Sequence, residues 1–143
     1  MKNILFLAFL LVCFLGATPQ SANAQGDWPA LKEFHGVMSQ TFHPMQEGNF
    51  KPIRERSMEM VKKAKAVAKS DIPEAYKNKE ILMELKNLAK GSKKLHKLVK
   101  KDKPDEEVGK SLDDLHNVFH RIMGLCSDHE EGHEGHNHEG HNH

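Results

Sequence analysis

Apolar and neutral residues recur along the middle of the chain at alternating steps of four and three residues. Four runs show this spacing, which is typical of helices that pack nearly parallel or antiparallel to one another. The runs are Leu31, His35, Met38, Phe42 and Met45; Ile53, Ser57, Met60, Ala64 and Val67; Ile81, Leu85, Leu88, Ser92, Leu95 and Val99; and Val108, Leu112, Leu115, Phe119, Ile122 and Cys126. No stretch of residues 25–127 alternates with period two for long enough to predict strands.

Helix-breaking residues separate the four runs. Residues 47–49 read Glu-Gly-Asn, residues 71–73 read Asp-Ile-Pro, and residues 102–105 read Asp-Lys-Pro-Asp. We expect Pro44 to kink the first helix or to end it near Phe42, and Gly124 with the segment after it to end the fourth. Short connections favour antiparallel neighbours, so the sequence predicts an all-α, up-down-up-down four-helix bundle.

The first 24 residues show the three-part pattern of a secretory signal. Lys2 is followed by an apolar run over residues 4–17 and by Ser-Ala-Asn-Ala at residues 21–24. Cleavage after Ala24 predicts a periplasmic or secreted protein. An uncleaved anchor is the alternative, but the apolar run is shorter than the ~20 residues that span a bilayer. A lipoprotein linked through Cys13 is rejected because Val12 is bulky and the apolar run continues past the cysteine. The remaining chain has no segment that could cross a membrane, so no membrane partner is expected.

The other end of the chain is rich in histidine. Residues 128–143 contain no apolar residue, so they are expected to form a disordered tail beyond a bundle domain of residues 25–127. The tail holds six of the eleven histidines, which are His129, His133, His136, His138, His141 and His143. An expression tag is the alternative, but tags are usually unbroken histidine runs. The spacing by Gly, Asn and Glu favours a tail that collects metal ions.

Charge is distributed unevenly between the tail and the bundle. The tail has acidic residues and no lysine or arginine, whereas the bundle is basic. Two clusters stand out, at Lys62, Lys63, Lys65 and Lys69 and at Lys93, Lys94, Lys97, Lys100, Lys101 and Lys103. No aromatic residues lie among these lysines, and an exported protein rarely meets nucleic acid. We therefore expect solvated helix faces and no nucleic-acid partner.

Signal cleavage would leave Cys126 as the single cysteine. A disulfide within the chain is then impossible. The thiol is expected to be buried, to ligate a metal, or to link two chains in a dimer.

Histidines of the first and fourth runs are predicted to meet inside the bundle. His35 and Met38 lie on the first run, and His116 and His120 lie one residue beside the fourth. A rise of 1.5 Å per residue in antiparallel helices puts His35 level with His120 and Met38 level with His116. Neutral imidazole suits zinc, copper or nickel, and a thioether favours reduced copper. The alternative is that these residues only fill the core.

Four other residues are expected to have lesser roles or none, and a fifth, His43, to end a helix. Residues near the start of the third helix that could complete the ligand shell are Tyr76, Glu80 and Met83. His43 precedes Pro44 and is expected to end a helix. His96 lies among lysines and is expected to be solvated.

Residues 115–122 read Leu-His-Asn-Val-Phe-His-Arg-Ile. This segment resembles the closing segment of the periplasmic four-helix cytochromes, the soluble b-type cytochrome and cytochrome c′. The resemblance covers residues 28–126 in topology but only a few positions in sequence. It implies a haem-ligating role for His120, with Met38, or His35 in its place, as the second ligand. The chain departs from the family in lacking Cys-x-x-Cys-His, which excludes covalent haem attachment. One haem would also leave extra imidazoles unused.

Few catalytic motifs occur in the sequence. There is no Gly-x-Ser-x-Gly and no phosphate-binding loop. The pattern His-Glu-x-x-His occurs once, at residues 129–133, where it is part of the histidine-rich tail and lies outside the predicted bundle. Asp113 precedes His116 at di-iron spacing, but one such element does not make a di-iron site. The sequence therefore favours a non-enzymatic metal-binding protein that sequesters, delivers or confers resistance to zinc, copper or nickel, with a metal-efflux or delivery protein as partner. A b-type haem electron-transfer protein is the alternative, and an adhesion or chaperone role stays open.

Overall fold

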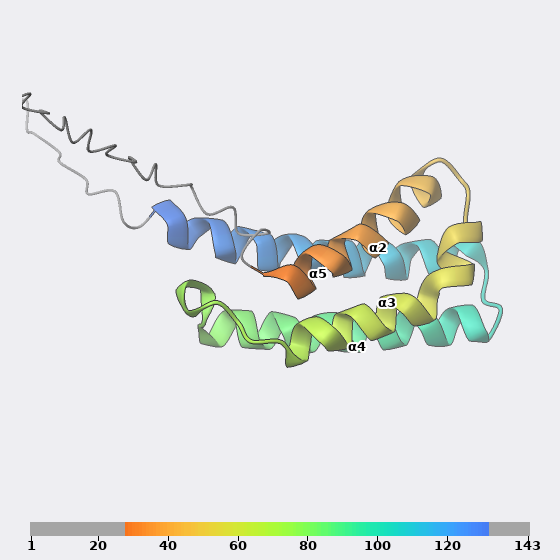
Figure 1. The fold of residues 1–143 in the computed structure, drawn as a ribbon. Helices are drawn as coiled ribbons and strands as arrows, with labels where there is room; N and C mark the ends of the chain where they lie inside the picture. Colours follow the sequence, from red (N-terminus) through yellow and green to blue (C-terminus); the bar gives the residue numbers. More distant parts are fainter. Residues whose placement is uncertain (1–27, 132–143) are drawn as a thin grey trace, which may run out of the picture.

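The computed structural model describes the backbone of residues 28–131 and the side chains of residues 28–127. The elements in this range are α2 (Pro29–Gln46), α3 (Lys51–Lys69), the 3-10 helix η1 (Glu74–Tyr76), α4 (Lys79–Lys100) and α5 (Asp105–Glu131). None of these residues lies in a strand. Consecutive α-helices run in opposite directions, and the start of α2 lies at the same end as the end of α5 (Figure 1). The predicted all-α, up-down-up-down four-helix bundle is confirmed.

The expected signal peptide lies outside the described residues, as do the tail histidines from His133 onward. His129 is in the last turn of α5, but its side chain is not described. Among the helices of residues 28–131, none is long and apolar enough to cross a membrane.

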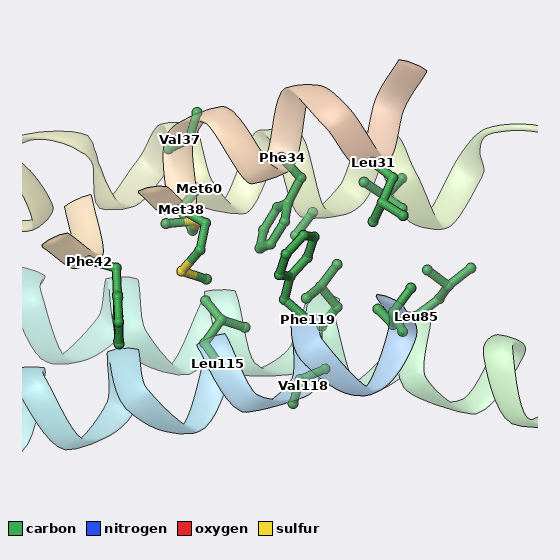
Figure 2. Packing of buried hydrophobic residues seen from close by; sticks show 14 of the residues in the cluster. Leu31, Phe34, Val37, Met38, Phe42, Met60, Leu85, Leu115, Val118 and Phe119 are labelled. Carbon is green, nitrogen blue, oxygen red and sulfur yellow. The ribbon is translucent and has the colours of Figure 1, made fainter. Parts of the chain in front are cut away.

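The predicted spacing of four and three residues lines the core. Every residue of the four runs is buried except His35 and Val99, which are half-buried. Figure 2 shows Phe34 and Phe119 facing each other between α2 and α5, and Met38 beside Met60. The buried hydrophobic residues form one continuous cluster, because each helix turns its apolar stripe toward the other three.

Two helix ends differ from those expected. Of the two outcomes expected at Pro44, an end near Phe42 was wrong: the first helix continues past Pro44 and ends at Gln46, because buried Met45 holds the last turn against the core. Gly124 lies inside α5 rather than at its end, and the helix continues to Glu131. Cys126 is fully buried there, so packing outweighs the helix-weakening effect of the glycine. The first four residues of the predicted tail are therefore helical.

Side-chain hydrogen bonds fix the connections between helices. Asn78 caps α4, because its Oδ1 accepts from the Ile81 backbone N–H at 2.8 Å. Arg54 of α3 donates from Nη2 to the Lys103 carbonyl at 2.7 Å and to Asp105 at 2.6 Å, which ties α3 to the α4–α5 connection. The Trp28 indole donates to Ser70 Oγ at 2.7 Å and joins the start of α2 to the end of α3.

The α2–α5 interface differs from the other three. Consecutive helices pack closely, whereas α2 and α5 make the fewest contacts of the four neighbouring pairs. Between α4 and α5, a Cβ added at Gly91 would lie 3.0 Å from Leu115 Cδ1. The close packing of the two helices at this point therefore depends on glycine. Between α2 and α5, aromatic rings span the interface, and the Phe34 and Phe119 centroids lie 5.8 Å apart. His35 and His116 lie along this interface.

Candidate metal site

Two imidazoles meet on the exposed side of α5. His116 and His120 are separated by one helical turn, which places both rings on the same side of the helix. Their Nε2 atoms lie 3.1 Å apart and form a hydrogen bond, in which one ring donates and the other accepts, so a bound ion would replace the shared proton. The rings meet edge to face, with centroids 4.4 Å apart and an interplanar angle of 85°. Both Nε2 atoms are therefore in reach of one small ion.

Phenyl rings from the core support two of the histidines across the α2–α5 interface. Phe42 of α2 stacks on His116 of α5, with centroids 3.7 Å apart and planes 14° apart. Phe119 of α5 stacks on His35 of α2, with centroids 4.9 Å apart and planes 19° apart. Each helix thus supplies a phenyl ring that orients an imidazole of the other. His116 and His35 are half-buried, whereas His120 is exposed.

The surroundings of these histidines favour the neutral imidazole. Burial lowers the pKa of His35 below its ordinary value, and the charges of His120 and His43 lower it further. Burial also lowers the pKa of His116, and His120 adds to this effect, while the nearby Asp113 carboxylate opposes it. The neutral imidazole is the form that binds a metal ion.

His43 also acts on these histidines, although its place beside Pro44 predicted only a helix end. Its charge lowers the pKa of both His35 and His116. His35 and His43 are eight residues apart, roughly two helical turns. That spacing is the signal in the sequence that could have linked His43 to the site.

The His116–His120 pair fits a transition-metal ion. A tetrahedral ion bound at about 2.0–2.1 Å from two nitrogens holds them about 3.3 Å apart, close to the observed separation. Among the described residues, no three His, Cys, Asp or Glu side chains lie close enough together to hold a metal ion. The structure therefore brings together two of the predicted ligands. The larger set with His35 stays a prediction.

Met38 and His120, the two haem ligands that the resemblance implies, occupy different environments. Met38 is fully buried in the core, whereas His120 is exposed beside His116. Figure 2 shows Met38 directed into the packed interior, near Met60 and Leu115. In this arrangement Met38 does not fit a ligand role for haem or for the ion at His116 and His120.

Other residues considered in the sequence lie away from the pair. Tyr76 is buried, whereas Glu80 and Met83 line a hollow of about 330 Å³ between α4 and α5, opposite Arg121 and Leu125.

His96 is half-buried rather than solvated. Its Nδ1 lies 3.0 Å from Ser57 Oγ, and this hydrogen bond joins α3 to α4. Cys126 is fully buried, which agrees with the first of its three expected roles and leaves the thiol out of reach of another chain.

No protein-family model, curated protein or solved structure matches this chain significantly. The resemblance to the four-helix cytochromes therefore stays a hypothesis.

Proposed function

We propose that this protein binds a zinc, copper or nickel ion through His116 and His120, as a periplasmic or secreted protein of metal sequestration, delivery or resistance. The observation that carries the proposal is the 3.1 Å separation of the two Nε2 atoms. Borderline divalent ions and imidazole nitrogen are well matched. The proposal includes no catalytic step.

The support of His116 by Phe42 favours binding. A ring that stacks at 3.7 Å is already oriented, so little rotational freedom is lost when the ion binds. Two protein nitrogens leave coordination positions for water or for other ligands. His35 would become a third ligand if its ring turned away from Phe119. A site with open positions suits a protein that receives an ion and passes it to an efflux or delivery partner.

Metal affinity of matched variants tests the proposal. The tail histidines would obscure the result, so all variants carry asparagine at these six positions, which are His129, His133, His136, His138, His141 and His143. Competition with a chromophoric chelator measures Zn²⁺, Cu²⁺ and Ni²⁺ affinity. His120→Asn is expected to abolish binding above background. His96→Asn, which removes an imidazole between α3 and α4, is expected to bind like its parent. Equal affinity of both variants would contradict the proposal.

Haem b, with electron transfer as the function, stays the alternative, although no observation on residues 28–131 favours it. Its test is the absorption spectrum of protein from cells with sufficient haem. A Soret band at roughly 400–420 nm that His120→Asn removes would replace the metal proposal with the haem one. A spectrum without that band agrees with the proposal.

A further inference from the structure

The two middle helices carry most of the positive charge of the molecule. Residues 51–103 contain 17 lysines and arginines against seven acidic residues, a net charge of +10. The rest of the chain has a net charge of −9. The near-neutral total of +1 therefore conceals a strong separation of charge between residues 51–103 and the rest of the chain.

The lysines of α4 form one stripe. They recur at steps of four and three residues, which keeps them on one side of the helix over roughly 21 Å. The stripe consists of Lys86, Lys90, Lys93, Lys97 and Lys100. All five are exposed, and the side of α4 opposite to them is buried, from Ile81 to Leu95. Within the described part of the chain, none of the five has an ion-pair partner.

Exposed apolar side chains lie on the same two helices. The large hydrophobic residues that the described chain exposes are Met58, Leu82 and Met83, at 45%, 47% and 54%. All three lie on α3 or α4. Leu82 and Met83 line a hollow of about 580 Å³ together with Lys79, Glu80 and Lys86. Met58 lies on the exposed side of α3 with Lys62 and Lys65.

We propose that this basic face, the exposed lysines of α3 and α4 with Met58, Leu82 and Met83, binds the surface of an anionic lipid membrane. Lysine ammonium groups attract acidic headgroups, and apolar side chains beside them enter the boundary between headgroups and acyl chains. The proposal is independent of the metal site. It revises the expectation of no membrane partner, because surface contact requires no membrane-spanning segment.

Lipid explains the face better than a soluble polyanion does. Single-stranded nucleic acid is usually held by aromatic rings on which bases stack. On α3 and α4, no described aromatic side chain is exposed. The exposed Leu82 and Met83 have no role against a soluble polyanion, whereas a lipid surface can bury them.

Vesicle sedimentation with the chain from Gln25 onward tests this proposal, because the apolar run of residues 4–17 would itself bind to vesicles of either kind. The probes are phosphatidylcholine vesicles with and without phosphatidylglycerol. We expect binding only to the anionic vesicles, and weaker binding as salt is added. The Lys90→Gln, Lys97→Gln double variant should bind about thirtyfold more weakly, from the usual contribution of each lysine near a charged bilayer. The matched control, Lys32→Gln with Lys110→Gln on α2 and α5, makes the same change in net charge and should bind like the parent.

A second double variant tests the contribution of the exposed apolar side chains Leu82 and Met83. Leu82→Ser with Met83→Ser should weaken vesicle binding but leave binding to soluble heparin unchanged, with circular dichroism confirming that the helices persist. Three results would each overturn the proposal: equal loss in both lysine double variants, equal binding to neutral vesicles, or vesicle binding by the serine variant that equals that of the parent. The first would show an effect of net charge alone, and the last would point to a soluble polyanion.

Discussion

Stacking of imidazole on phenyl subjects His116 and His35 to two opposing effects. A phenyl face attracts a cation by about 0.5–1 kcal/mol at an exposed site, which favours protonation. Burial of the ring and the charges of neighbouring histidines disfavour it, and they lower the pKa of both groups. The net effect is a lowered pKa for both imidazoles. In the folded chain the two rings therefore stay neutral at a pH where the same rings begin to take up protons in the unfolded chain.

The free energy of unfolding is therefore expected to decrease on acidification. Below about pH 6.5 the unfolded chain binds protons that the folded chain does not, so stability falls until the lowered folded-state pKa values are passed. Thermal unfolding over a pH series measures this. The His35→Phe, His116→Phe double variant keeps rings in the stacks and should lose much of the dependence. His96→Gln serves as the control and should retain it. Parallel pH profiles for parent and double variant would rule out these rings as the cause.

At the scale of single elements, two glycines near each other in the chain have opposite roles. Gly36 is exposed inside α2, and a Cβ there would meet no atom within 4 Å. Gly48 follows α2 with a φ of +82°, in the left-handed region that glycine adopts without strain. The first glycine weakens a helix, whereas the second allows the α2–α3 turn.

Substitution by alanine should accordingly change stability in opposite directions. Gly36→Ala is expected to stabilise the protein by roughly 0.5–1 kcal/mol, because alanine favours the helical backbone. Gly48→Ala is expected to destabilise it by about 1 kcal/mol, because a Cβ is strained at that φ. Urea unfolding of both variants beside the parent gives the two signs. If Gly36→Ala is destabilising, α2 is constrained by something other than its backbone preference.

The helices themselves could be predicted from the sequence because burial repeats with the helical period. Leu31, Met60 and Leu112 are all buried as their spacing indicates. Helix ends were predicted less well. Pro44 and Gly124 weaken a helix locally, but packing of later residues in the same helix decides where it ends, and that packing is a property of the whole fold.

The site could be predicted only in part for a similar reason. The spacing of His116 and His120 was enough to place both rings on one side of α5. The stacking on Phe42 and Phe119 depends on side-chain rotamers and on the register of two helices far apart in the chain. The effect of His43 on the pKa of His35 and His116 was missed, because its sequence neighbour Pro44 suggested only a helix end.

At the scale of the whole molecule, an ion at the α5 pair should stabilise the fold. An ion that binds only the folded chain adds about 2.7 kcal/mol when its free concentration is a hundred times the Kd. For a domain of roughly 100 residues this corresponds to a rise in Tm of roughly 10–20 °C. Thermal unfolding of the variant without tail histidines, with and without each metal, measures the rise. His120→Ala should lose most of it while its metal-free Tm changes little, because its ring is exposed.

The weaker contact between α2 and α5 also has a consequence for how the chain folds. The three closely packed pairs are neighbours in sequence, and only the loosest pair joins the first helix to the last. Most native contacts therefore close short loops, which gives the low contact order of proteins that fold in microseconds to milliseconds. Only the α2–α5 interface requires the longest loop to close, so only this interface carries the largest loss of chain entropy. Pairing of α2 with α5 can accordingly come last, after the three helical hairpins have formed.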